Sequence, residues 1–276
     1  RVQREVCNMS ASHNSPKVVT DDLVLYIDVN NPKCVDASAA LTSSTKLKNL
    51  AGGSYSDIQL GVYDSGAVPE MQFIKHEQSG LWIYDQDGVS DTGENPGWLS
   101  DANYDRTDDD NNYTFMCWYK YPFGNSTQRP QNIYGGGFQS KTSFVLTWSG
   151  TSASRGVLRY PTSGTTGAYS NTNTQFSSNE QWVCFAATDR NVGGGTYETK
   201  FYFNGQLFGT STAGATFVAP TGNNKFTWGS WSGGYGAATM KSNLFMYYNK
   251  TLTAEEILHN YESTRERFGS VHDIEN

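Results

Sequence analysis

The sequence has 276 residues, of which 37% are hydrophobic, 14% aromatic and 17% charged. This aromatic content excludes a wholly disordered chain, because it supplies enough apolar surface to offset the entropy lost on ordering. The net charge of −7, without any basic cluster, excludes nucleic acid and anionic membranes as expected partners. No apolar run approaches the ~18 residues of a membrane span, and the low charge with many Ser, Thr, Asn, Gly and Tyr indicates an all-β protein that works outside a cell.

The first twenty residues, Arg1 to Thr20, are polar and show no clear period. They predict an N-terminal arm, followed by a single domain over residues 21–276. Ordering a polar terminus costs about 1–2 kcal/mol per residue in backbone entropy, so an ordered arm must be held by something. The domain's own surface would suffice, but pairing with the exposed sheet edge of a neighbouring copy is the more economical arrangement.

Short apolar segments separated by turn residues follow along the chain. Asp22–Asp28 predicts a first strand, closed by the turn residues at 30–32, and Tyr113–Tyr119 predicts a strand that is covered on both faces. Residues 85–112 are rich in Asp, Gly and Asn and predict a long surface excursion. Asn204-Gly205 predicts a two-residue type I′ hairpin, because both positions require φ > 0. Further strands are expected at residues 144–148, 156–160, 182–187 and 200–203 and from residue 207 onward.

One helix is expected near the end of the chain, over Ala254–Arg267. The sequence Thr253-Ala254-Glu255-Glu256 is a capping box, in which the hydroxyl of Thr253 and the carboxylate of Glu256 satisfy each other's backbone amides. Leu252 and Ile257 occupy the two positions of a hydrophobic staple. The expected role of this helix is structural, closing one edge of the sandwich.

Four stretches of the sequence resemble successive motifs of one family. They are Leu23–Pro32, Tyr113–Lys120, Trp182–Gly205 and Leu244–Phe268. The family is the concanavalin A-like lectin/glucanase (laminin-G-like) jelly-roll superfamily, and the likeness is greatest to the version found in bacteriophage virion proteins. The resemblance implies an all-β fold over about residues 22–269: a two-sheet antiparallel jelly-roll sandwich with one short C-terminal helix. These motifs consist mostly of core and turn residues, so they indicate architecture rather than ligand.

A catalytic site of the kind found in glucanases of this superfamily is not expected. Those enzymes resemble laminarinases, in which an E-x-D-x-x-E strand motif places acid and nucleophile on one face, as retaining hydrolysis requires. In this sequence Glu70 has no carboxylate two positions later, and Glu255 and Glu256 belong to the helix cap. The four histidines are scattered. We therefore predict no catalytic residues and no enzymatic activity.

Calcium is the one cofactor that the sequence leaves open. Asp101, Asp105 and Asp108 offer hard oxygen ligands in an acidic loop, and proteins of the resembled fold often carry Ca²⁺ at their loop rim. A second acidic group lies at residues 85–88. Neither has the spacing of an EF-hand, and a solvated acidic loop is the alternative interpretation. No other cofactor is expected.

Aromatic residues in a Gly-rich stretch form the candidate carbohydrate site. Trp228, Trp231 and Tyr235 could present a stacking platform for sugar rings, while Trp98 and Tyr104 fall in the predicted acidic loop. Packing in the core is the alternative role for such aromatic residues.

The four cysteines show no C-x-x-C spacing, so a zinc site is not expected. The resemblance to pentraxins, which join cysteines in the two corresponding strands, implies a disulfide between Cys117 and Cys184. Cys117 stands one position later than the pentraxin cysteine, however, which would turn it to the opposite face of its strand. Buried free thiols are the alternative interpretation.

The resemblance as a whole predicts a non-enzymatic structural protein of a phage particle. It would be a capsid decoration or a tail or fibre component, with contact to host-surface glycans as a second role. Its expected partners are other copies of itself, other virion proteins and host carbohydrate, and its expected location is the virion or the extracellular space. The alternatives are a secreted lectin-like carbohydrate-binding or adhesion module and, more remotely, a glycoside hydrolase.

Overall fold

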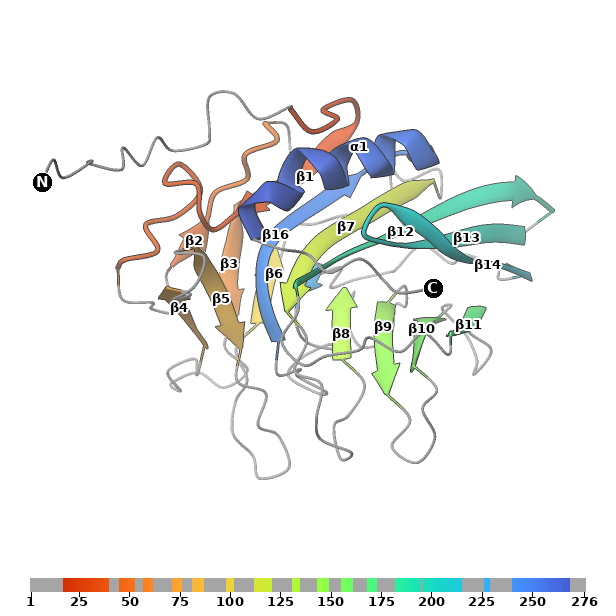
Figure 1. The fold of residues 1–276 in the computed structure, drawn as a ribbon, viewed down its shortest axis with the longest axis horizontal. Coiled ribbons are helices and arrows are strands. Elements are labelled where there is room, and N and C mark those ends of the chain that lie inside the picture. The colour runs from red at the N-terminus through yellow and green to blue at the C-terminus, as the bar shows by residue number, and fades with distance from the viewer. Residues whose placement is uncertain are drawn as a thin grey trace, which may run out of the picture.

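A computed structural model provides the fold of the chain (Figure 1). Within the part that it describes, sixteen β-strands precede one α-helix and a short 3₁₀ turn. The longest helix is too short and too polar to cross a membrane. The described residues are 17–39, 45–52, 57–61, 71–75, 81–86, 98–101, 112–120, 131–134, 143–148, 155–160, 168–172, 182–194, 196–214, 226–228 and 240–268.

The larger layer is an antiparallel eight-stranded sheet, here called sheet A. Its strand order is β14-β13-β12-β7-β16-β5-β4, and β1 also pairs with β16. The last strand in the sequence, β16, therefore lies in the middle of the sheet. The strands are β1 (Leu23–Asp28), β4 (Met71–Lys75), β5 (Trp82–Gln86), β7 (Tyr113–Lys120), β12 (Trp182–Gly193), β13 (Thr196–Phe203), β14 (Gln206–Gly214) and β16 (Met240–Tyr248).

The remaining strands form two four-stranded sheets. Sheet B has the order β15-β6-β3-β2, and sheet C has the order β11-β10-β9-β8. Their outer strands β15 and β8 lie beside each other, and β11 lies beside β14 of sheet A. The strands are β2 (Lys46–Leu47), β3 (Ile58–Gly61), β6 (Trp98–Asp101), β8 (Gln131–Tyr134), β9 (Ser143–Trp148), β10 (Arg155–Tyr160), β11 (Ala168–Thr172) and β15 (Phe226–Trp228).

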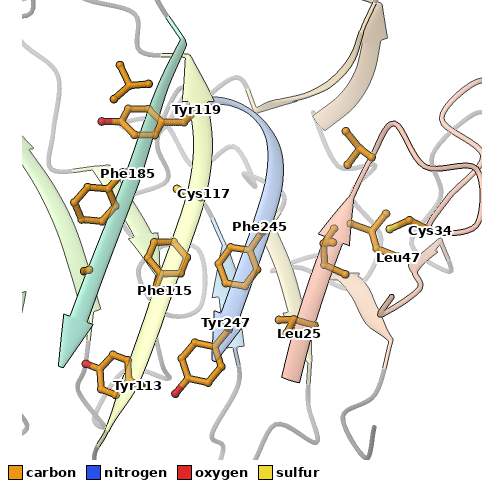
Figure 2. Packing of buried hydrophobic residues seen from close by; sticks show 14 of the residues in the cluster. Leu25, Cys34, Leu47, Tyr113, Phe115, Cys117, Tyr119, Phe185, Phe245 and Tyr247 are labelled. Carbon is orange, nitrogen blue, oxygen red and sulfur yellow. The ribbon is translucent and has the colours of Figure 1, made fainter. Parts of the chain in front are cut away.

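The centre of sheet A is buried on both faces, as the unbroken aromatic sequence of β7 predicts. Alternate residues of β7 enter two different clusters of buried side chains, because successive side chains of a strand point to opposite faces. The inner cluster contains Phe115 and Phe245, whose ring centroids are 4.8 Å apart, together with Leu47 of sheet B (Figure 2). The outer cluster contains Trp118 and faces the helix.

The outer cluster is covered by α1 (Ala254–Arg265) and η1 (Glu266–Phe268). Trp118 stacks on Phe268 with ring centroids 4.2 Å apart, and its indole N–H donates to Thr264 Oγ1 at 2.8 Å. The predicted helix is thus confirmed, with its last turn in 3₁₀ form. The two-sheet antiparallel sandwich with a C-terminal helix, inferred from the resemblance, is confirmed as well.

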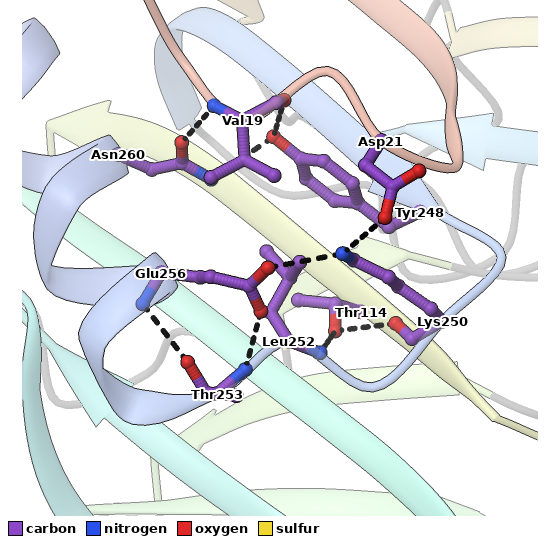
Figure 3. Close-up of polar contacts among 9 residues, drawn as sticks. All are labelled: Val19, Asp21, Thr114, Tyr248, Lys250, Leu252, Thr253, Glu256 and Asn260. Carbon is purple, nitrogen blue, oxygen red and sulfur yellow. Dashed lines mark hydrogen bonds and ion pairs between the residues drawn. The ribbon is translucent and has the colours of Figure 1, made fainter.

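The local turn and cap predictions are also confirmed. Thr253 accepts from the amide of Glu256 at 3.2 Å, and Glu256 Oε2 accepts from the amide of Thr253 at 2.8 Å (Figure 3). Asn204 and Gly205 have φ of 47° and 79° between β13 and β14. A Cβ on Gly205 would lie 2.9 Å from Leu258, so both the backbone conformation and the contact with α1 favour glycine here.

One predicted boundary is wrong. The expected surface excursion over residues 85–112 contains the end of β5 and the whole of β6. Partner strands β3 and β15 stabilise β6, and sequence pattern alone does not show them. Of the predicted N-terminal arm, Lys17 and Val19 contact α1 of the same chain. Residues 1–16 lie outside the described part of the chain.

Candidate functional site

Two of the sequence-predicted aromatic residues occur at the same end of a short strand pair. β6 and β15 pair antiparallel over three residue pairs, with Trp228 opposite Leu99 and Phe226 opposite Asp101. Trp98 stands one residue before Leu99, so it lies at the same end of the pair as Trp228. The structure thus places Trp98 in a strand beside the glycan candidate Trp228 rather than in an acidic loop.

The chain connections make this end of the strand pair the edge of the sandwich. In sheet A, Gln86 at the end of β5 pairs with Met240 at the start of β16. Residues 87–97 lead from Gln86 to Trp98, and residues 229–239 lead from Trp228 to Met240. Both connections therefore join the same two pairs of neighbouring strand ends. We call these four strand ends, with their two connections, the rim.

The remaining glycan candidates belong to the rim by chain position. Trp231 and Tyr235 occur within residues 229–239, and they lie outside the described residues. The segment that carries them is joined to the rim at both ends, at Trp228 and at Met240. Sequence reasoning did not find this grouping, because it depends on the register of β6 with β15 and of β5 with β16.

The one calcium candidate that the structure describes, Asp101, lies away from the rim. Asp101 is the last residue of β6, at the end of the strand pair opposite to Trp98 and Trp228. Asp105 and Asp108 follow it and lie outside the described residues. Among the residues that the structure describes, no group of three or more His, Cys, Asp or Glu could hold a metal ion. Calcium binding therefore stays a prediction.

The predicted disulfide between Cys117 and Cys184 is wrong. Both residues are buried free thiols, and so is Cys34. Cys117 pairs with Phe185, while Cys184 pairs with Trp118, so the two cysteines are offset by one register position. Because side chains alternate along a strand, Cys117 enters the inner cluster and Cys184 the outer cluster. The one-residue displacement noted in the sequence is thus the physical reason that no bond forms.

A group of amides fixes the start of β5, the strand that leads to the rim. Asn30 donates from Nδ2 to the carbonyl of Trp82 at 2.8 Å and accepts from the amide of Trp82 at 2.7 Å. Asn243 Nδ2 donates to the same carbonyl at 2.6 Å. Asn243 lies where the register of β16 shifts, between its pairing with β5 and its pairing with β1. The three residues therefore join β1, β5 and β16 at one point.

The buried ionisable groups serve the fold. Asp28 at the end of β1 forms an ion pair with Arg267 of η1, which ties sheet A to the C-terminal helix. Burial, followed by the nearby charge of Asp28, raises the pKa of Tyr26 to about 12. Burial also raises the pKa of the Cys34 thiol to about 12. Asp28 faces a guanidinium rather than a second carboxylate, so this group lacks the carboxylate pair of a retaining glycosidase.

The family follows from a match to a family model. The model of the concanavalin A-like lectin/glucanases superfamily matches residues 94–258, which is more than half of the chain. The chain belongs to this superfamily. The matched region runs from the rim strand β6 to the middle of α1 and so contains Trp98, Trp228, Trp231 and Tyr235. Comparison with curated protein sequences finds no match.

Solved structures with the same fold include receptor-binding domains of botulinum neurotoxins. A structure of botulinum neurotoxin type C, whose cell entry is described as dependent on interaction with two ganglioside molecules, matches with a TM-score of 0.60 and 13% identity. The match covers 89% of this chain and 52% of that one. The binding domain of botulinum neurotoxin DC in complex with SialylT matches with a TM-score of 0.59 and 13% identity, over 89% and 52% of the two chains. This chain thus spans about half the length of these structures, and the likeness establishes the fold.

Proposed function

We propose that this protein is a non-enzymatic carbohydrate-binding module whose sugar site is the rim. The observation that carries the proposal is that the strands carrying Trp98 and Trp228 end together at the rim, where the segment carrying Trp231 and Tyr235 begins. Trp and Tyr side chains have large apolar faces with polar tips, which suit the apolar faces of sugar rings.

The similar structures support a glycan as the ligand. Two of them are described in terms of gangliosides and of a complex with SialylT, and their fold matches that of this chain over 89% of its length. The net charge of −7 disfavours a strongly anionic ligand. We therefore propose glycans of a host-cell surface as the ligand class, with neutral or weakly charged glycans favoured over strongly anionic ones.

The absence of enzymatic activity is part of the proposal. Several carboxylates of the described residues are engaged in structural contacts: Asp28 with Arg267, Glu256 with the helix cap, and Asp189 with the Thr199 hydroxyl. Purified protein should release no reducing sugar from laminarin, agar or peptidoglycan. Turnover that persists through repurification would contradict this.

A glycan array followed by substitution at the rim tests the sugar site. Trp228→Ala and Trp231→Ala should each weaken binding of the best array ligand by about thirtyfold, because aromatic anchors carry most of the energy of such contacts. Trp148→Ala is the matched control, since Trp148 ends β9 of sheet C, which contains none of the four rim strands. The proposal is wrong if no glycan binds, or if the control weakens binding as much as the rim variants do.

For the biological setting, we propose a virus particle, as a capsid decoration or a tail or fibre component. The resemblance of the opening and closing motifs to phage virion proteins supports this setting. We propose in addition that the acidic segment after Asp101 binds calcium. Mass spectrometry of purified native particles should find the chain as a repeated component. If the chain is found only in secreted material, the setting is wrong while the sugar site stands. Chelation with EDTA during the array measurement tests the metal separately.

A further inference from the structure

The segment Lys17–Thr20, here called the strap, is bound in the seam between α1 and the end of β16 (Figure 3). The amide of Val19 donates to Asn260 Oδ1 at 2.8 Å, and its carbonyl accepts from the Tyr248 hydroxyl at 3.0 Å. Asn260 Nδ2 donates to the same hydroxyl at 2.9 Å. Asn260 and Tyr248 are both fully buried. Two buried polar side chains therefore bind the backbone of a single strap residue.

The seam has the chemistry of a peptide-binding site. His259 Nε2 lies 2.8 Å from the carbonyl of Lys17, and Val18 and Val19 pack against the outer cluster. Backbone hydrogen bonds supply affinity in such sites, and small apolar pockets supply selectivity. None of these contacts depends on the strap belonging to the same molecule as the seam.

The turn that returns the strap to its own domain is strained. Asp22 has a φ of 55°, in the left-handed region that non-glycine residues rarely adopt. The turn is closed by a long hydrogen bond, from the Leu23 amide to the Thr20 carbonyl at 3.3 Å. Opening the turn would release this strain while leaving the strap free to bind an identical seam elsewhere.

We propose that the seam binds the strap of a second copy of the chain, so that two copies exchange Lys17–Thr20. The exchanged and unexchanged forms make the same strap contacts, so the balance between them depends on turn strain and on local concentration. Asp22 stays on its own domain, because its carbonyl accepts from the amide of Asn249 at 2.9 Å. The residues from Val19 to Asp22 span at most about 10 Å, so the α1 surfaces of the two copies must lie against each other.

Crosslinking between differently labelled copies tests the exchange. Every chain carries Cys7→Ser, since Cys34, Cys117 and Cys184 are buried. One chain adds Lys17→Cys and the other adds His259→Cys, and the two are mixed at increasing concentration with a short bifunctional thiol crosslinker. We expect a covalent dimer that increases with concentration and is absent when either chain is treated alone.

Substitution in the turn changes the balance between the two forms. Asp22→Val should raise the dimer yield about fivefold, because a β-branched residue disfavours the closed turn. Lys33→Val, which adds branching at an exposed turn position outside the strap, should leave the yield unchanged.

Further variants decide between the alternatives. Val19→Pro removes the amide that donates to Asn260 and should abolish the dimer while the domain stays folded by circular dichroism. A chain carrying both cysteines should give the internal product at low concentration. If only that internal product forms at every concentration, the strap never leaves its own domain and the proposal fails. If neither product forms, the seam does not hold the strap, and the proposal fails as well.

Discussion

Asn243 is the residue at which the central strand β16 changes its neighbour from β5 to β1. It is fully buried, and its Nδ2 donates to the carbonyl of Trp82 at 2.6 Å. We predict that Asn243→Ala lowers the free energy of unfolding by about 2 kcal/mol, through the lost hydrogen bond and the space left behind. Urea denaturation measures the change. Gln206→Ala, at an exposed position of β14, is the control and should cost less than about 0.5 kcal/mol.

The cysteines give a second prediction at this scale. Burial raises the pKa of Cys34 to about 12 and raises the pKa values of Cys117 and Cys184 as well. Only the thiolate reacts with disulfide reagents, and unfolding returns each thiol to its ordinary pKa. A Cys7→Ser variant should therefore show almost no reaction with Ellman's reagent at pH 8 when native, and three reactive thiols in denaturant. A count of one in denaturant would indicate the Cys117–Cys184 bond after all.

At the scale of elements, α1 is held at its start by its capping box. Thr253→Ala should lower the free energy of unfolding by about 1 kcal/mol at pH 7, since it leaves the Glu256 amide without its partner. Burial acts to raise the pKa of Glu256. Hydrogen bonds from the backbone of Thr253 and from Lys250 outweigh burial and lower this pKa from its ordinary 4.5. Because folding lowers this pKa, the stability that the Glu256 carboxylate contributes is complete above about pH 4.5. It is lost as the pH falls through the pKa of Glu256 in the folded protein.

Substituting the carboxylate tests that pH dependence. Glu256→Gln should reduce stability at pH 7 and make unfolding midpoints less sensitive to pH below about 4.5. Parallel urea titrations of the two proteins between pH 3 and pH 7 give the comparison. If both proteins lose stability equally between pH 4.5 and pH 3, Glu256 contributes nothing to the acid sensitivity of the fold.

Elements whose sequence signals lie in adjacent residues were predictable, whereas elements that depend on distant partner strands were not. α1, β7 and the hairpin at Asn204-Gly205 were predictable, because a capping box, an aromatic run and two positive φ angles are properties of adjacent residues. β6 was missed because it has four residues in a polar stretch and depends on β3 and β15. The rim was missed for the same reason: its aromatic residues were identified one by one, but their proximity depends on two distant registers.

At the scale of the whole molecule, the strap Lys17–Thr20 is bound to the domain that was predicted to begin at residue 21. Deleting residues 1–16 should leave the melting temperature unchanged. Deleting residues 1–20 should lower it by about 5 °C, because Tyr248 and Asn260 lose their bonds to Val19 inside the domain. Differential scanning calorimetry of the two truncations measures this, and equal melting temperatures would contradict the seam contacts.

The position of β16 in the middle of sheet A has a consequence for biosynthesis. β1 and β5 both pair with this strand, which spans residues 240–248 of 276. A chain that leaves the ribosome from its N-terminus would therefore expose β1 without its partner strand until residues 240–248 are made. The nascent chain would depend on chaperones during that interval, because unpaired apolar strands aggregate. Protease resistance of ribosome-bound chains should accordingly appear only once residue 248 has cleared the exit tunnel.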